Sequence, residues 1–558
     1  MNNDLQIARA AKIRPITEIA QKLGIDADDL ELYGKYKAKL PLKLINREKV
    51  KENQNKLILV SAISPTPAGE GKTTVSIGLS EGMNRIGKQT TVVLREPSLG
   101  PVFGIKGGAT GGGHSQVIPM EDINLHFTGD FSAIEKANNL LAALIDNNIQ
   151  SNSRSLNLDP RTVHWKRVMD MNDRSLRHTI VGLGGTASGI PRETGFNITA
   201  ASEIMAILCL AEDFHDLKVR LGNIFVGFTF DKQPVYARDL NAQGAMAVLL
   251  KDAIKPNLVQ TLEGNPAIIH GGPFANIAQG TNSVLATKLG LSLSDYVVTE
   301  AGFGFDLGAE KFLDIKCVSA GIKPQAAVLV ATVRALKYHG EIPVGDLVPP
   351  NPEAVREGLP NLEKHVENMH KFNICPVVAV NRFHTDTQEE LDVIVTRCQQ
   401  LGVKVAVVDA WAKGGEGTEE LAKMVAEVVD ACVSDFKPLY DWNWSIEKKI
   451  ETIAHEIYGA SAIDYTPQAK KDLKTIQSLG LGGLPVCMAK TQKSLSDNPK
   501  LLGRPENFVV TVREIEIAAG AGFVVPITGE IMRMPGLPAV PAAEGMDIDD
   551  DGTIIGLF

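Results

Sequence analysis

Short apolar runs alternate along the chain with segments whose apolar residues have helical spacing. The run at 56–64, KLILVSAIS, is rich in β-forming residues, and so is the run at 89–97, QTTVVLREP. Between them a glycine-containing loop leads into TTVSIGLSEGMNRIG, in which the apolar spacing is that of a helix. This order predicts a βαβ unit whose two strands lie parallel in a covered sheet.

The same alternation continues well beyond this unit. Apolar runs that end in glycine or polar residues predict a large α/β domain over 1–360, with a mostly parallel sheet like that of P-loop NTPases. An inserted subdomain near 135–290 is expected to interrupt it. Residues 341–361 are rich in proline, so they are expected to form a linker or a surface crossing.

A second strand–helix–strand–helix pattern follows. Residues 361–440 hold apolar runs at 373–383 and 403–411, and each run is followed by a helical segment. Thr387 begins the first of these helices with the spacing of a capping box. This pattern predicts a second, smaller α/β domain over 361–440 and leaves 441–558 as a less regular C-terminal domain.

Composition narrows the functional classes. The 558 residues are 44% hydrophobic and 22% charged, with a net charge of −9, which suits a globular chain of several domains. The acidic balance disfavours nucleic acid or an anionic membrane as a partner. The six cysteines form no C-x-x-C pair, which is typical of reduced thiols in the cytoplasm, and no histidine cluster has metal-ligand spacing.

The segment 64–78, SPTPAGEGKTTVSIG, resembles a phosphate-binding loop. Gly71, Lys72 and Thr73 match the pattern G-x-x-x-x-G-K-[ST], but its first glycine is replaced by Thr66. A strand before the loop and a helix after it favour an ATP site, with a lysine for the phosphates and a hydroxyl for Mg²⁺. The alternative is a glycine-rich helix cap with an incidental lysine.

Arg95 ends the strand after this loop, so it should emerge at the same edge of the sheet. An arginine there suits a small anion or a migrating phosphoryl group, although a surface salt bridge is the simpler alternative. The glycine-dense run that follows predicts a long functional loop. Whether its His114 or His126 takes part in chemistry stays open.

Two aromatic residues end the later strands. Phe383 follows the run at 373–383 and Trp411 ends the run at 403–411, so both would lie at one edge if the strands are parallel neighbours. Either ring could instead cap the core. The glycine-rich GGEG after Trp411 favours a ligand, and a flat ring system would suit both side chains.

Taken together, these motifs are similar to those of a known family. TPAGEGKTT, REPSLGPVFGIKGGATGGGHSQV, MEDINLHFTGD, HGGPFANIAQG, EAGFGFDLGAEKF, ATVRALKYHG, VNRF and DAWAKGGEG run through almost the whole chain. The chain resembles formate–tetrahydrofolate ligases, also called 10-formyltetrahydrofolate synthetases, in their monofunctional bacterial form. The resemblance implies ATP-dependent ligation of formate to N10 of tetrahydrofolate through formyl phosphate, in one-carbon metabolism, by a homotetramer.

The resemblance also implies site residues. The loop residues implied to bind ATP with Mg²⁺ are Thr66, Pro67, Ala68, Gly69, Glu70, Gly71, Lys72, Thr73 and Thr74. Lys72 and Arg95 are the implied catalytic residues, and Arg95 would bind formyl phosphate. The implied folate-stacking rings are Phe303, Phe383 and Trp411, and the implied ligands of an activating NH₄⁺ or K⁺ are Glu96 and Asp130.

Three positions depart from the family pattern, at Asn197, Gln279 and Thr281, and their roles stay open. Two other functions also remain at this point. One is an ATP-dependent ligase that activates a carboxylate for a different amine. The other is an ATP-driven partitioning switch, which would need a basic or amphipathic surface element that this acidic sequence does not show.

Overall fold

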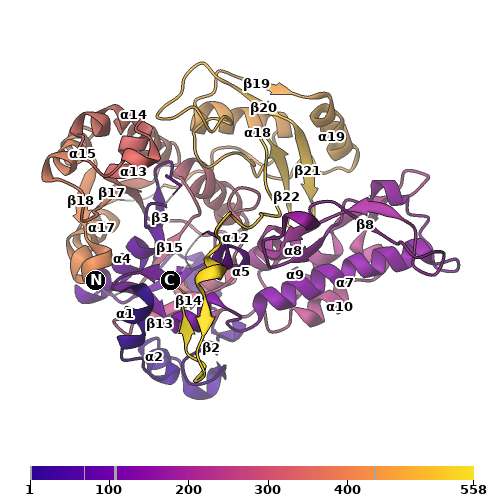
Figure 1. Cartoon of the computed structure of the whole chain (residues 1–558), viewed down its shortest axis with the longest axis horizontal. Helices are drawn as coiled ribbons and strands as arrows, with labels where there is room; N and C mark the ends of the chain where they lie inside the picture. The colour runs from indigo at the N-terminus through magenta and orange to yellow at the C-terminus, as the bar shows by residue number, and fades with distance from the viewer. Residues whose placement is uncertain (1–2, 68, 106–109, 433–434, 558) are drawn as a thin grey trace.

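A computed structural model of the chain describes residues 3–67, 69–105, 110–432 and 435–557 (Figure 1). Its centre is a sheet of twelve strands, ten of which follow one another across the sheet. In spatial order these are β1 (Glu31–Leu32), β2 (Ala38–Lys39), β13 (Asn257–Thr261), β14 (Pro266–Ile269), β4 (Thr90–Leu94), β15 (Tyr296–Glu300), β3 (Lys56–Ala62), β16 (Ala326–Ala331), β17 (Cys375–Asn381) and β18 (Lys404–Val408). The mixed α/β architecture predicted from the sequence is confirmed.

The functional half of the sheet is parallel. Every neighbouring pair from β14 to β18 runs parallel, whereas the pairs among β1, β2, β13 and β14 are antiparallel. The strands β3 and β4 of the predicted βαβ unit are therefore parallel, but β15 lies between them. All carboxyl ends of these strands meet at one edge, where ligands bind in open α/β sheets.

Both faces of the sheet are buried. Alternate residues of β3 belong to two separate cores, with Leu57 and Leu59 in one and Ile58 and Val60 in the other. Helices α4 (Lys72–Arg85) and α17 (Glu419–Ala431) cover one face; α11 (Val284–Leu293) and α14 (Pro352–Lys371) contribute to the core on the other. Such coverage explains the continuous apolar runs of these strands.

The sheet continues through the segment predicted as a second domain. Strands β17 and β18 pair with β16, so 361–440 shares its sheet with the preceding residues. Residue 360 lies inside α14, so residues 352–361 are helical, whereas residues 341–351 run mostly exposed along the surface. Pro352 occupies the first turn of α14, where a missing N–H costs no hydrogen bond.

A helical lobe projects from one side of the sheet, toward the right in Figure 1. It is built from α7 (Asp130–Gln150), α8 (Glu203–Leu210), α9 (Phe214–Gly222) and α10 (Gln243–Leu249), with the hairpin of β8 (Thr179–Val181) and β9 (Arg192–Thr194) near its far end. Among the described residues, no helix is both long and apolar enough to cross a membrane.

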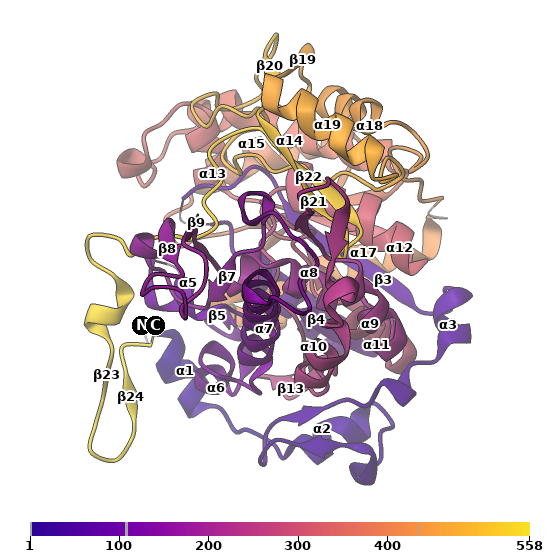
Figure 2. The same ribbon diagram turned by 90° about the vertical axis from the view of Figure 1, so that its right-hand side faces the viewer.

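The C-terminal part packs against the same large core (Figure 1). It holds α18 (Ile446–Thr452), α19 (Pro467–Ser478), the parallel pair β19 (Ala462–Tyr465) and β20 (Val509–Val512), and the hairpin of β21 (Glu514–Ala518) and β22 (Phe523–Ile527). The last hairpin, β23 (Asp547–Ile548) and β24 (Ile554–Ile555), returns to the N-terminal helix α1 (Asp4–Ala10), as Figure 2 shows. There Arg9 donates to the carbonyl of Ile554.

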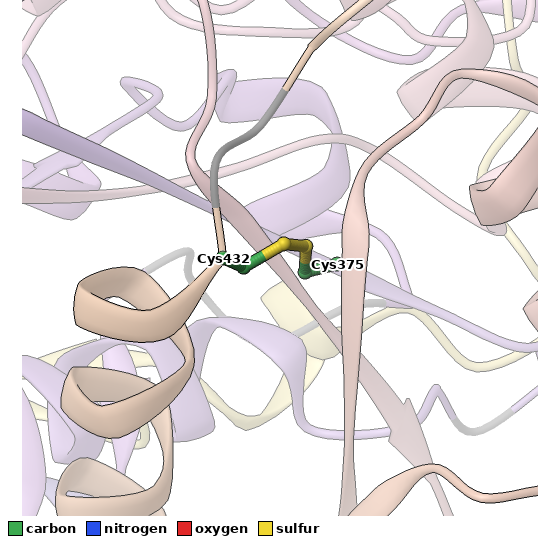
Figure 3. Close-up of a disulfide and its surroundings, with 2 residues drawn as sticks. All are labelled: Cys375 and Cys432. Atoms are coloured by element: carbon green, nitrogen blue, oxygen red, sulfur yellow. A yellow bond between two sulfur atoms is a disulfide. The ribbon is translucent and has the colours of Figure 1, made fainter.

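One pair of cysteines departs from the expectation of reduced thiols. Cys375, at the start of β17, and Cys432, at the end of α17, are joined by a disulfide with a Cα–Cα distance of 6.7 Å (Figure 3). The other four cysteines are free and buried. Sequence spacing could not show this pair, because 57 residues separate its members and only the sheet brings them together.

Candidate active site

A glycine loop joins β3 to α4 at the carboxyl edge of the sheet. Gly69 and Gly71 have φ of +80° and +71°, a conformation that side chains other than glycine rarely adopt. A Cβ on Gly71 would stand 2.5 Å from the side-chain amide of Asn381, so this glycine also permits a close approach. Lys72 is the first residue of α4, which places its charge at the positive end of the helix.

Thr66 braces the loop. Its N–H and its hydroxyl donate to Glu70 Oε1 over 2.7 Å and 2.9 Å, and both residues are buried. The hydroxyl of Thr332 donates to the other oxygen of Glu70. Thr66 does not adopt a positive φ, so the loop needs no glycine there. The departure from the motif is therefore a side chain that ties the two ends of the loop.

Glu300 joins the loop to Arg95. It ends β15, between the strands that carry the loop and the arginine. One carboxylate oxygen accepts from Thr73 Oγ1 over 2.9 Å, and the other lies 3.5 Å from Arg95 Nη2. The Glu300 side chain is 3% exposed. An acidic residue in this place is typical of Mg²⁺ sites in phosphate-loop proteins.

The segment after β15 encloses Arg95. Gly302 lies so close that a Cβ there would stand 2.9 Å from Arg95 Nη1. Phe303 follows with φ +58°, which is rare for an aromatic residue and costs energy that the surroundings must offset. Backbone strain of this kind clusters at functional sites. The structure thus brings Arg95 and Phe303 to the same part of the rim.

Glu96 and Asp130 lie together in the interior beside a lysine. Lys39 Nζ contacts Asp130 Oδ1 at 2.7 Å, and Asn257 donates to Asp130 Oδ2 over 2.9 Å. Glu96 Oε2 has no hydrogen-bond partner among the described residues. Burial, and then the nearby charge of Asp130, hold the pKa of Glu96 well above its usual range. Lys39 forms its ion pair with Asp130, and no described cation pairs with Glu96, so the cluster has oxygen ligands for one more small cation.

The two predicted aromatics follow neighbouring parallel strands, but they contact different segments. Phe383 comes after β17, and the guanidinium carbon of Arg334 lies 3.7 Å from its ring centroid. Trp411 lies in the short helix α16 (Ala410–Lys413) after β18. A Cβ on Gly113 would stand 2.7 Å from the Trp411 indole, so the turn between β5 (Gly111–Gly112) and β6 (Ser115–Ile118) packs directly against this ring. Both rings are partly exposed.

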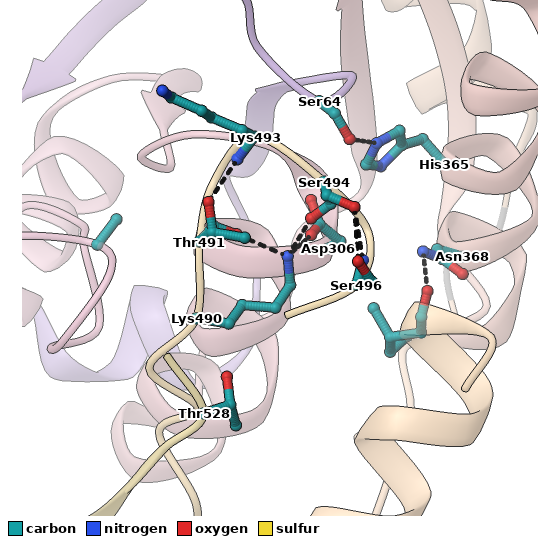
Figure 4. Close-up of polar contacts among 12 residues, drawn as sticks. Ser64, Asp306, His365, Asn368, Lys490, Thr491, Lys493, Ser494, Ser496 and Thr528 are labelled. Atoms are coloured by element: carbon teal, nitrogen blue, oxygen red, sulfur yellow. Dashed lines mark hydrogen bonds and ion pairs between the residues drawn. The ribbon is translucent and has the colours of Figure 1, made fainter. Parts of the chain in front are cut away.

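The root of the phosphate loop is held from the opposite side. Ser64 makes four buried hydrogen bonds. Its N–H donates to Asn361 Oδ1, and its carbonyl accepts from His339 Nε2 over 2.8 Å. Its hydroxyl bonds to His365 Nε2 over 3.1 Å, as Figure 4 shows, and accepts from Asn361 Nδ2 over 3.1 Å. Gly503 N–H donates to His339 Nδ1, so His339 must be neutral to serve both partners. Burial lowers its pKa, in agreement with a neutral ring.

A buried ion pair lies beside this root (Figure 4). Lys490 Nζ contacts Asp306 Oδ2 at 2.8 Å, and their side chains are 1% and 2% exposed. The same ammonium donates to the carbonyls of Thr491 and Ser494. Because Asp306 follows the Phe303 segment, the C-terminal part supports both the loop root and the rim.

The remaining predicted residues have clear positions. Pro67 is exposed, Thr74 lies partly buried in the first turn of α4, and Ala68 lies outside the described residues. Gln279 and Thr281 are buried. Asn197, on β10 (Phe196–Ile198), lines a cavity of about 450 Å³ beneath the C-terminal part.

Sequence reasoning missed Glu300, Arg334 and Lys39. The only signal for Glu300 was an acidic residue directly after the apolar run of β15, which becomes meaningful once that strand lies beside β3. Arg334 and Lys39 carried no signal, because distant segments bring them to their partners.

A mostly parallel central sheet that is covered by helices on both faces defines the class of α/β proteins. The model of the formate–tetrahydrofolate ligase family matches residues 2–558. The chain belongs to this family, and it is an enzyme that joins formate to tetrahydrofolate at the expense of ATP.

Proposed function

We propose that this enzyme activates formate as formyl phosphate at the rim formed by the phosphate loop, Glu300 and Arg95. A formate oxygen attacks the γ-phosphorus of ATP, and ADP leaves. N10 of tetrahydrofolate then attacks the formyl carbon, and the C–O bond to phosphate breaks. The phosphate departs with the formate oxygen, and the amine loses a proton. The product is 10-formyltetrahydrofolate.

The observation that carries this proposal is the contact of one buried carboxylate with both Thr73 and Arg95. It supports a geometry in which the loop holds the ATP phosphates and Arg95 holds the anion that receives the γ-phosphoryl group. The main-chain N–H groups of the loop and Lys72 would neutralise the phosphates. The Arg95 fork suits carboxylate and phosphate oxygens alike.

Two cations fit the residues present. The hydroxyl of Thr73 and the carboxylate of Glu300 are the oxygen ligands that Mg²⁺ prefers, and Mg²⁺ would offset the phosphate charge. Glu96 and Asp130 would hold an activating NH₄⁺ or K⁺. The unpartnered oxygen of Glu96 and the shortage of positive charge around the pair support this role.

Folate would bind against Phe303, Phe383 and Trp411, which lie after strands of the same rim. We also propose the homotetramer of the family, acting in the cytoplasm. Exposed apolar residues on the far hairpin of the lobe, such as Ile180 and Leu183, offer a surface for association.

Isotope transfer tests the proposal. With formate labelled by ¹⁸O in both oxygens, each turnover should release phosphate that carries one ¹⁸O atom, together with 10-formyltetrahydrofolate. Formation of the product with unlabelled phosphate would exclude formyl phosphate. The rival ligase would instead turn over formate and ATP with another amine and would not bind tetrahydrofolate.

A further inference from the structure

We infer that Arg334 is a positioning residue that links the phosphate loop to the ring of Phe383, so that ATP and folate are positioned through one side chain. The inference rests on the proposed function, because it takes Phe383 as a ring that stacks on folate.

The first contact is with the loop. Arg334 Nη2 donates to the carbonyl of Gly69 over 2.9 Å. Gly69 has a positive φ, and its carbonyl shares a rigid peptide plane with the N–H of Glu70, so this contact fixes the direction of that N–H. Loop N–H groups must point toward the phosphates if the loop is to bind ATP. Arg334 therefore holds the loop in a defined conformation from outside.

The second contact is with Phe383. The guanidinium carbon lies 3.7 Å from the ring centroid, which is the distance of close stacking. One face of the ring is thus covered by Arg334. A flat ligand can stack only on the other face, so the arginine fixes both the orientation of the ring and the side on which folate binds.

The helix that carries Arg334 is itself anchored to the loop. Helix α13 (Val333–His339) begins after Thr332, whose hydroxyl donates to Glu70 and whose oxygen accepts from the N–H of Ala335. At its other end His339 donates to Ser64. Arg334 therefore projects from a helix that is hydrogen-bonded at both ends to the phosphate-loop segment. Phe383 belongs to another connection, the one that follows β17.

One donor of Arg334 is still unused. Its Nε is buried and has no hydrogen-bond partner among the described residues. An unsatisfied buried N–H is unfavourable, so an acceptor on a bound ligand would stabilise the arginine in this position. The Arg334 side chain should therefore be most ordered when a ligand occupies the site.

A double-mutant cycle tests the link. Dissociation constants for ATP and for tetrahydrofolate would be measured by calorimetry for the wild type, Arg334→Ala, Phe383→Ala and the double variant. Each single change should weaken the binding of tetrahydrofolate by roughly three- to tenfold, the range expected for loss of a stacking contact. The double variant should be no weaker than Phe383→Ala within about twofold, because the two changes remove one shared interaction.

The conservative variant separates the two contacts. Arg334→Lys retains a donor for the Gly69 carbonyl but loses the planar stack, since an ammonium has no flat face. It should bind ATP within roughly threefold of the wild type and lose tetrahydrofolate affinity as Arg334→Ala does. Arg356→Ala, which removes an exposed arginine on α14, is the matched control and should change neither affinity.

Two results would overturn the link. One is a double variant in which the two losses of tetrahydrofolate affinity multiply, and the other is an Arg334→Lys variant that keeps tetrahydrofolate affinity. A wild-type protein that binds ATP but not tetrahydrofolate would refute the proposed function and this inference together. If Arg334→Ala has a lower melting temperature, Arg334→Lys and Phe383→Ala still decide the question. A loss of tetrahydrofolate affinity without a loss of ATP affinity does not depend on overall stability.

Discussion

Restoring the phosphate-loop consensus should weaken the loop. Thr66→Gly would give this chain the pattern G-x-x-x-x-G-K-T, which ordinary motif logic treats as an improvement. In the structure, however, the Thr66 hydroxyl donates over 2.9 Å to the buried carboxylate of Glu70. The glycine variant keeps the hydrogen bond from the backbone N–H of residue 66 to Glu70 but loses the one from the hydroxyl.

The expected cost follows from two contributions. A hydrogen bond to a charged group contributes about 1.5–3 kcal/mol. The added backbone freedom of glycine costs about 0.5–1 kcal/mol more. The smallest sum, about 2 kcal/mol, corresponds to roughly a thirtyfold change in an equilibrium constant. This loss should appear in ATP affinity if the loop orders on binding, and in the melting temperature if it is already ordered.

Both quantities are therefore needed. ATP affinity can be measured by calorimetry and stability by thermal melting, for Thr66→Gly beside two controls. Thr66→Ser keeps the hydroxyl and should resemble the wild type; Thr66→Val removes the hydroxyl without the freedom of glycine and should lose roughly tenfold. A glycine variant that binds ATP within twofold of the wild type and melts at the same temperature would falsify the bracing role of Thr66.

The remaining predictions concern the rim and its support. Arg95→Ala should abolish formate-dependent ADP release while ATP still binds, and unchanged turnover would remove Arg95 from the mechanism. Trp411→Ala should mainly weaken tetrahydrofolate in a binding assay, whereas a loss confined to ATP would assign this ring to adenine. Lys490→Met should destabilise the fold by about 3–5 kcal/mol, seen as a lower melting temperature, because it leaves the Asp306 charge buried and unpaired. Lys490→Met with Asp306→Asn should recover part of this loss, and a double variant as unstable as the single one would show that the charge is not the cause.

Much of the fold could be predicted because local patterns were strong. The apolar run of β3, the glycine loop and the helix after it agree in sequence and in structure. The capping box at Thr387 is also confirmed. The helix over 352–361 could not be predicted from its prolines, because proline interrupts most helices but is favoured in the first turn, where Pro352 lies.

The site was harder to predict, for a different physical reason. The phosphate loop is a local motif, so the sequence alone could indicate it. Glu300 reaches Thr73 only because β15 lies between β3 and β4, and local hydrophobic periodicity does not predict the order of strands in a sheet. Lys39 meets Asp130 across 91 residues of sequence, so neither residue hints at the other.

The anchoring of Ser64 has a consequence for the synthesis of the chain. Its supports include Gly503, through His339 and Asn361, so the loop root is secured by a segment that is translated long after the loop itself. A ribosome will have made the ATP motif long before it makes this anchor. We expect ribosome-bound nascent chains to acquire ATP binding only after that segment has emerged. ATP binding by much shorter nascent chains would contradict this expectation.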